Sequence, residues 1–168
     1  MKQMTIYYGS TTGTCETLAS MIANALGIGS ENVHNVTDMT KETLEGSDML
    51  ILGSSTWGCG DLQDDWYDGV EILKKADLAG KPVALFACGD GESYGDTFCE
   101  AMTHLKDALA DSGCTFIGSV PAEGYNFTGS TAVEGGHFIG LALDDVNESD
   151  KSEERIANWA KQILSETA

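Results

Sequence analysis

Short apolar runs alternate with amphipathic stretches from one end of the chain to the other, which is the pattern of strands separated by helices. The run at 49–53 is almost continuously apolar, as is typical of a strand in a parallel sheet covered on both faces. Strands are predicted at residues 4–8, 33–36, 49–53, 82–88 and 115–118, with more strand at 138–143. The pattern therefore predicts an α/β protein built on a parallel sheet of five strands.

The stretches between the strands carry apolar residues at helical spacing. Helices are predicted over about 14–26, ending at Gly27, and over about 64–73. A third helix is marked by Phe98, Met102, Leu105 and Leu109, and the last by Ile156, Trp159, Ala160, Ile163 and Leu164. Asp150 and Glu153 are spaced as a capping box for this last helix. Helices on both faces of such a sheet make a three-layer, doubly wound sandwich.

Ligands of doubly wound sheets bind at the carboxyl ends of the strands, near the point where the strand order reverses. The loops after the first, third and fourth predicted strands are therefore the candidate binding loops. A stretch at about 119–137, rich in Gly, Ser and Thr, interrupts the alternation and is interpreted as an excursion out of the fifth strand. No linker or repeat divides the chain, so we expect one domain over residues 1–168.

Charge and composition exclude several classes of function. The formal net charge of −18 leaves no basic face for nucleic acid, and it favours a soluble monomer that attracts basic partners. No apolar run approaches the ~20 residues of a membrane span and no signal sequence opens the chain, so we expect a cytoplasmic protein without membrane contact. The five cysteines form no Cys-x-x-Cys pair, which indicates neither a disulfide framework nor a metal site.

The turn from Ser10 to Glu16 lies between the first strand and the first helix, where unpaired backbone N–H groups and the helix dipole favour an anion. No Lys or Arg occurs between Lys2 and Lys41, so a phosphate here would be held by hydroxyls and amides alone. The lack of a lysine in this turn excludes the lysine-containing nucleotide loop. A cradle of hydroxyls and amides suits the single phosphate of a mononucleotide. A Ser/Thr-rich turn that only caps its helix is the alternative.

Each of the other two candidate loops places one large aromatic residue among glycines. Trp57 lies in the loop after the third strand, and Tyr94 lies in the acidic loop after the fourth. Glycines let the backbone approach a flat ligand closely, and two aromatic rings on neighbouring loops would sandwich a planar heterocycle. Either ring alone is better explained by packing, and Trp66 and Trp159 are expected to fill core or helix-packing positions.

Three motifs in this order resemble those of the flavodoxin family: the hydroxyl-rich turn 10–16, Ser-x-Thr-Trp-Gly at 54–58, and Gly-Asp-x-x-x-Tyr-Gly-Asp at 89–96. The excursion at about 119–137 resembles the insertion of long-chain flavodoxins, and the similarity spans essentially the whole chain. The resemblance implies a parallel sheet of order 2-1-3-4-5 with an insertion in strand five. It also implies noncovalently bound FMN and an electron-carrier role.

The resemblance also implies which residues bind the cofactor. The turn after strand one would hold the phosphate, Trp57 and Tyr94 would stack on the two faces of the isoalloxazine, and the Gly58 backbone would face flavin N5. The candidate cofactor-binding residues are Ser10, Thr11, Thr12, Gly13, Thr14, Cys15, Ser55, Thr56, Trp57, Gly58, Cys59, Gly60, Cys88, Gly89, Asp90, Tyr94 and Asp96. Cys15 stands where the family usually has Thr. A thiol is a weaker donor, so Cys15→Thr is expected to tighten FMN binding.

Acidic residues follow two of the candidate loops, and no Lys or Arg lies between Lys41 and Lys74 or between Lys81 and Lys106. Negative surroundings disfavour the anionic, fully reduced flavin. The prediction is a low-potential one-electron carrier that cycles mainly between semiquinone and hydroquinone. Its expected partners are basic-surfaced redox proteins, with reductases of the flavodoxin or ferredoxin type as donors and oxidoreductases as acceptors.

An FMN-dependent NAD(P)H:quinone reductase on the same fold is the alternative. Such an enzyme needs a pocket for a nicotinamide donor. The sequence offers no basic residue for the phosphate of that donor and no His–acid pair near the loops, because His34, His104 and His137 fall on a strand, a helix and the insertion. We therefore expect an electron-transfer protein without catalytic residues.

Overall fold

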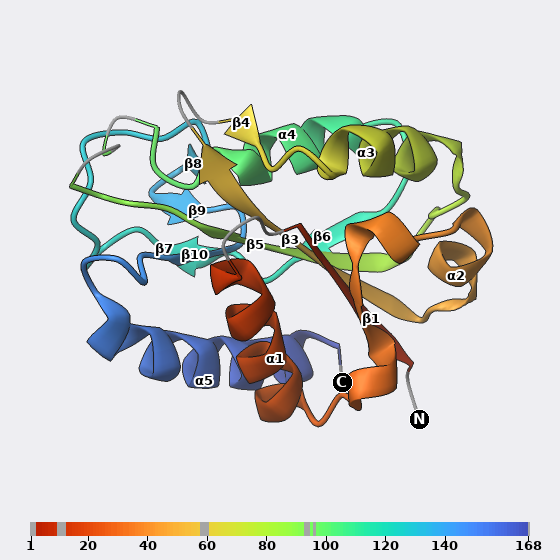
Figure 1. Cartoon of the computed structure of the whole chain (residues 1–168), viewed down its shortest axis with the longest axis horizontal. Coiled ribbons are helices and arrows are strands. Elements are labelled where there is room, and N and C mark those ends of the chain that lie inside the picture. Colours follow the sequence, from red (N-terminus) through yellow and green to blue (C-terminus); the bar gives the residue numbers. More distant parts are fainter. Residues whose placement is uncertain (1–2, 10–12, 58–60, 93–94, 96, 168) are drawn as a thin grey trace.

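The computed structural model describes residues 3–9, 13–57, 61–92, 95 and 97–167, with the backbone alone for residues 57 and 61. Its central sheet has the strand order β10-β5-β3-β1-β2, and the neighbours along this path are parallel (Figure 1). These strands are β1 (Met4–Gly9), β2 (Val33–Asn35), β3 (Met49–Trp57), β5 (Pro82–Cys88) and β10 (Leu141–Leu143). Counted along the chain, the order is 2-1-3-4-5, which confirms the predicted topology.

The fifth strand is divided into two pieces, and both pieces pair with β5. The piece β6 (Thr115–Ile117) lies beside the start of β5, and β10 lies beside its end. Between them, β7 (Val120–Pro121), β8 (Val133–Glu134) and β9 (His137–Phe138) form a separate antiparallel sheet in the order β7-β9-β8. The predicted excursion is therefore an insertion with a small sheet of its own.

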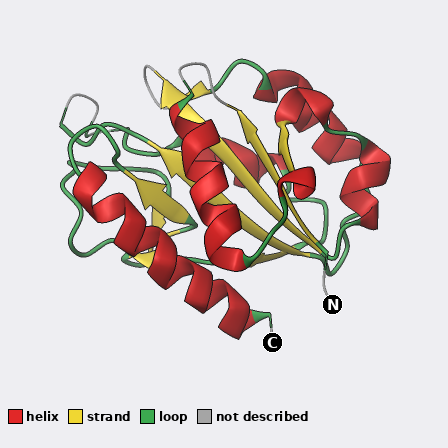
Figure 2. Cartoon of the chain, turned by 60° about the horizontal axis from the view of Figure 1, so that its bottom comes forward, coloured by secondary structure: helices red, strands yellow, loops and turns green. Residues whose placement is uncertain are grey.

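Helices cover both faces of the central sheet, which gives the predicted three layers (Figures 1 and 2). The helices α1 (Thr14–Leu26) and α5 (Ser149–Glu166) pack together on one face, and α3 (Trp66–Lys75) and α4 (Ala101–Ala108) pack together on the other. The shorter elements are α2 (Lys41–Gly46), the 3-10 helices η1 (Ser30–Asn32) and η2 (Val36–Asp38), and β4 (Asp61–Leu62). Within the described segments, no helix combines the length and apolarity that crossing a bilayer requires.

The centre of the sheet is shielded from solvent on both sides, as the apolar run in β3 predicts. Leu50, Ile51 and Leu52 are all 0% exposed although their side chains alternate between the two faces. Trp66 and Trp159 are also buried, which confirms their expected core positions. Their indole N–H groups donate to the backbone carbonyls of Gly53 and Gly118 at 2.7 and 2.8 Å, so neither buried N–H is unsatisfied.

Two local predictions are wrong. Residues 138–143 do not form one strand: β10 contains only Leu141–Leu143, and at Gly140 a Cβ atom would lie 2.1 Å from the carbonyl oxygen of Leu85 in β5. Phe138 instead belongs to the insertion sheet. The capping box is also absent, because α5 begins after Glu148 without a side-chain cap and Asp150 lies inside its first turn.

An aromatic cluster attaches the insertion to the rest of the protein. The rings of Tyr125, Phe127 and Phe138 from the insertion pack with Phe98, with ring centroids between 4.9 and 6.1 Å apart. The Tyr125 hydroxyl donates to the carbonyl of Ala142 in β10 at 2.8 Å. Burial raises the pKa of Tyr125 to about 12, so the phenol stays protonated and keeps donating.

Arg155 of α5 attaches the insertion a second time. Its guanidinium lies 3.8 Å from the centroid of the Tyr125 ring, and its Nη2 donates to the carbonyl of Gly124 at 3.2 Å. Nη1 lies 3.1 Å from Oε1 of the buried Glu148. Burial alone would raise the pKa of the Glu148 carboxyl, but Lys151 and Arg155 hold it below its usual value. The insertion therefore rests against a charged pair at the start of α5.

Gly53 is the position in β3 where an added side chain would be most disruptive. A Cβ atom there would lie 2.0 Å from the ring of Phe86, which is fully buried in β5. We expect Gly53→Ala to lower the free energy of unfolding by about 1–3 kcal/mol through overpacking. Urea denaturation followed by circular dichroism measures this loss.

The matched control is Gly46→Ala at the end of α2, where a Cβ atom would meet nothing within 4 Å. This control is expected to be neutral or slightly stabilising, because Ala favours a helix over Gly. Equal stability of the two variants would contradict the close approach of β3 and β5.

Candidate functional site

The carboxyl ends of β1, β3 and β5 meet in one row at the edge of the sheet. Gly9 at the end of β1 pairs with Ser54 in β3, and Ser54 pairs with Ala87 in β5. The three candidate loops therefore begin side by side, although they are separated along the chain. Gly9 is required in this row, because a Cβ atom there would lie 2.5 Å from the indole of Trp66.

The first candidate loop leads into the start of α1. Gly13 precedes the helix with φ of 92°, a conformation that favours glycine, and among the described residues no side chain caps the helix there. The hydroxyl of Thr17 donates back to the carbonyl of Gly13 at 3.0 Å. The backbone N–H groups of the first turn, from Thr14 onward, have no partner within the helix and suit an anion. Ser10, Thr11 and Thr12 lie outside the described residues.

Cys15 does not take the place of a phosphate-binding hydroxyl. Its side chain is 0% exposed, and its Sγ lies 2.7 Å from Sγ of Cys88 in the core. Only the backbone N–H of Cys15 belongs to the first turn of the helix and remains a candidate for contact with an anion. The reason for expecting Cys15→Thr to strengthen binding through an extra hydroxyl bond is therefore removed.

The second candidate loop is shorter than the sequence pattern predicts. β3 continues to Trp57 and pairs with the antiparallel β4, so that Thr56 lies opposite Leu62. Gly58, Cys59, Gly60 and the Trp57 side chain lie outside what the structure describes. Ser55 and Thr56 are half-buried. The hydroxyl of Thr56 accepts from the Ala101 N–H at 3.4 Å, so this candidate also supports the start of α4.

The third candidate loop follows Cys88 and is tied to the end of β10. The N–H of Gly89 donates to the carbonyl of Leu143 at 2.9 Å, and the N–H of Gly91 donates to the carboxylate of Asp144 at 3.0 Å. Asp90 accepts from the side chain of Asn147 at 2.7 Å. Gly89 and Asp90 are therefore held in place, whereas Tyr94 and Asp96 lie outside the described residues.

Asp144 and Asn147 were missed by the sequence reasoning. Asp144 is 1% exposed and accepts from the backbone N–H of Asn147 at 3.0 Å as well as from Gly91. One signal could have found it: Asp144 directly follows the apolar run of β10, at the same edge as the other loops. Its partners could not be predicted, because Gly91 is distant along the chain.

The insertion supports the third loop from behind. The carbonyl of Gly95 accepts from the backbone N–H groups of Thr128 and Gly129 at 2.7 and 2.8 Å. A Cβ atom at Gly91 would lie 2.1 Å from the carbonyl oxygen of Asn126, so the loop and the insertion are in close contact. The insertion therefore contacts the described part of this loop at Gly91 and Gly95.

Carboxylates dominate the charge beside these loops. Asp64, Asp68 and Glu92 are exposed, and Asp65 is half-buried. Among the residues that the structure describes, no group of three His, Cys, Asp or Glu side chains could hold a metal ion. The site therefore combines an uncharged anion cradle with a negative rim, which suits a ligand with one phosphate rather than a metal–triphosphate complex.

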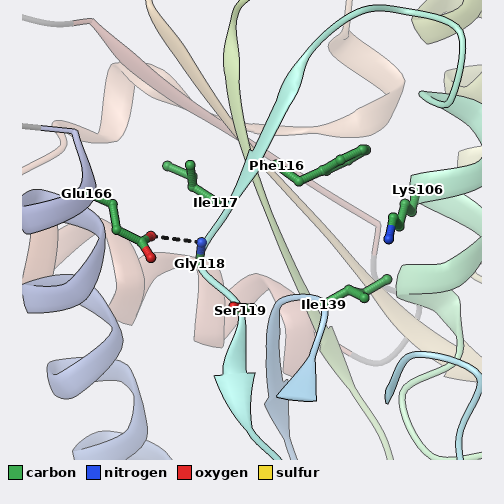
Figure 3. A pocket seen from close by; sticks show the side chains of 7 residues that line it. All are labelled: Lys106, Phe116, Ile117, Gly118, Ser119, Ile139 and Glu166. Atoms are coloured by element: carbon green, nitrogen blue, oxygen red, sulfur yellow. Dashed lines mark hydrogen bonds between the residues drawn. The ribbon is translucent and has the colours of Figure 1, made fainter. Parts of the chain in front are cut away.

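A separate hollow of about 410 Å³ lies beside β6. It is lined by Lys106, Phe116, Ile117, Gly118, Ser119, Ile139 and Glu166. In Figure 3, Glu166 approaches from α5 and accepts the N–H of Gly118, at 2.9 Å, while Lys106 points in from α4. No candidate cofactor-binding residue lines this hollow. Its described lining is therefore separate from the candidate loops.

Comparisons with known proteins agree on one family. Residues 6–159 match the family model described as Flavodoxin. The chain is 41% identical to Flavodoxin 1 of Salmonella typhimurium over 96% of this chain and 92% of that protein, and 43% identical to Flavodoxin 2 of Salmonella typhi over 98% and 96%. The crystal structure of Fusobacterium nucleatum flavodoxin bound to flavin mononucleotide superposes with a TM-score of 0.89 at 30% identity, covering 99% of each chain.

Asp144 gives a direct test of how the third loop is held. Replacing Asp144 with Ala would leave the buried N–H of Gly91 without its acceptor. We expect a loss of about 1–3 kcal/mol in the free energy of unfolding, together with faster amide hydrogen exchange in residues 89–92. Asp150→Ala, on the exposed first turn of α5, is the control. Equal exchange in the two variants would show that Asp144 does not hold the loop.

Proposed function

Because the chain belongs to the flavodoxin family, we propose that it binds one FMN noncovalently and carries electrons between redox proteins, without catalysing a reaction on a substrate of its own. Family membership supports this function, and the solved relative from Fusobacterium nucleatum has flavin mononucleotide bound. The single observation in this chain that carries the proposal is the meeting of three loops at the ends of β1, β3 and β5.

The phosphate of FMN fits the start of α1. Gly13, which has no side chain, stands at the N-cap of the helix, so the backbone N–H groups of the first turn can donate to the phosphate oxygens. Ser10, Thr11, Thr12 and Thr14 would add hydroxyl donors from the same turn. A cradle of amides and hydroxyls matches one phosphate group and explains why no cationic side chain is needed there.

The ring system of FMN would lie between the other two loops. Trp57 at the tip of the β3–β4 hairpin would stack on one face and Tyr94 on the other. Ser55, Thr56 and residues 58–60 would lie along one loop, and Cys88, Gly89, Asp90 and Asp96 along the other. Asp144 anchors the described part of the third candidate loop through the Gly91 N–H. The ring would therefore meet a loop backbone that is held in place before binding.

FMN supplies the ability to accept and release electrons one at a time. The carboxylates of Asp64, Asp68, Asp90 and Glu92 oppose the negative charge that full reduction adds, which lowers the potential of the second electron. We therefore assign the protein a low-potential role, in which it cycles mainly between the one-electron-reduced and the fully reduced states.

The same carboxylates favour a basic partner. Rim charges act mainly on the rate of encounter, so they would steer the exposed edge of the site toward positive surfaces on reductases and acceptor proteins. A monomeric chain suits this role, because each partner must reach the same loops in turn.

The cofactor proposal is tested by adding FMN to flavin-free protein. We expect stoichiometric quenching of flavin fluorescence, followed by two separated one-electron steps on stepwise reduction with dithionite, the second at a lower potential than in free FMN. Riboflavin, which lacks the phosphate, is the control ligand and should bind much more weakly. Failure to bind FMN would overturn the proposal, and steady oxidation of NADH or NADPH by the loaded protein would indicate an enzyme instead.

The docking proposal is tested with cytochrome c, a small basic electron acceptor. The rate at which the reduced protein transfers electrons should fall as ionic strength rises. At low salt, the double variant Asp64→Asn/Asp68→Asn should react about 2–10-fold more slowly, because steering charge is lost. The variant Glu31→Gln/Glu42→Gln removes the same charge from η1 and α2, at the opposite end of the strands, and should keep the original rate. Equal slowing in both variants would mean that only net charge matters.

A further inference from the structure

A cluster of buried thiols lies directly beneath the candidate cofactor loops. Cys15 and Cys99 are 0% exposed and Cys88 is 7% exposed, and all three are free cysteines. Cys99 Sγ donates to the carbonyl of Ala87 at 3.5 Å, so it is directed at the backbone. Electron transfer through the proposed FMN site gives none of these thiols a task.

Cys15 and Cys88 stand apart from the third thiol because their sulfur atoms face each other. The two Sγ atoms lie 2.7 Å apart, although the residues are 73 positions apart in the chain. An S–S bond is about 2.05 Å long, so a small shift of the two side chains would bring the sulfur atoms to bonding distance. The fold itself therefore brings the two sulfur atoms together from distant parts of the chain.

We propose that Cys15 and Cys88 form a reversible disulfide that ties the first turn of α1 to the end of β5. The oxidant is a hydroperoxide, which is small enough to reach the pair at Cys88, whose surface is 7% exposed. One thiolate attacks the peroxide oxygen, giving a sulfenic acid and releasing water or an alcohol. The second thiol then attacks that sulfur and releases water, so the two thiols lose two electrons and two protons in total.

The position of the bond gives it a structural consequence. It would join the segments that are proposed to hold the phosphate and the ring edge of FMN, and it would close a long loop of the unfolded chain. Closing such a loop removes conformational freedom from the unfolded state, so the oxidised protein should be more stable than the reduced one. The inference rests on the thiol geometry and does not require a bound flavin.

The environment makes oxidation slow rather than impossible. The hydrogen bond with Cys15 and burial raise the pKa of the Cys88 thiol well above its usual value, and burial raises that of Cys99. Since the thiolate is the reactive form, the bond should form faster as pH rises. Cys114 is only half-buried and has no thiol partner among the described residues, so it should react with peroxide without forming this cross-link.

The test is made on the purified full chain, with its cofactor as isolated. Protein treated with hydrogen peroxide is alkylated at its remaining thiols, digested and mapped by mass spectrometry. We expect a peptide pair joined through Cys15 and Cys88, with the loss of two hydrogen atoms. The thermal midpoint should rise by about 5 to 15 °C, and dithiothreitol should reverse both changes.

The matched variants separate this bond from the other thiols. Cys88→Ser should abolish the linked peptide and the oxidation-dependent rise in thermal midpoint, whereas Cys99→Ser should keep both. If Cys88→Ser fails to fold, Cys15→Ser and the peptide map of the unaltered chain give the answer. The proposal is overturned if Cys88 pairs with Cys59 or Cys99, if Cys15 and Cys88 reach sulfinic or sulfonic acid without joining, or if both remain thiols after Cys114 has reacted.

Discussion

The parallel pairing of β1, β3 and β5 is the constraint on which the rest of the structure depends. In parallel strands the carboxyl ends lie on the same edge, so Gly9, Ser54 and Ala87 fall in one row and the loops that follow them converge. Small residues in this row make the arrangement possible. Gly9 admits the indole of Trp66, and Gly53 admits the ring of Phe86, so the helices and strands behind the loops pack closely.

The insertion in strand five has a clear mechanical role in this architecture. Its aromatic residues pack with Phe98, and its backbone donates to the carbonyl of Gly95 in the loop that carries Tyr94. The buried pair of Arg155 and Glu148 fixes its other side. Lys151 also lies 2.9 Å from the Glu148 carboxylate, so two cationic side chains hold this carboxylate beside the insertion. The insertion, which the sequence pattern indicates only as an irregular stretch, therefore contacts and supports the third candidate loop.

Much of the fold and part of the candidate site could be predicted from local pattern. The helix over 14–26 and the strand over 82–88 match α1 and β5, because each has a strong periodicity and a clear stop signal. The break at Gly140 and the hairpin after Thr56 could not be predicted, since each depends on a neighbouring strand rather than on its own residues. The anchor at Asp144 was missed for the same reason: its partner, the N–H of Gly91, belongs to another loop.

Local chemistry in the sequence determined which segments are candidates to bind an anion and a flat ring, and that the first turn itself contains no Lys or Arg. The capacity of a hydroxyl to donate, of a glycine to admit a close ligand and of an aromatic ring to stack belongs to the residue type, so the sequence alone reveals it. Only the tertiary structure decided where the sulfur atom of Cys15 points. In the sequence it follows a row of hydroxyl residues that are candidates for phosphate binding, but in the fold helix α1 turns it into the core against Cys88. The direction of a side chain depends on what packs around it, and that is set by contacts between distant parts of the chain.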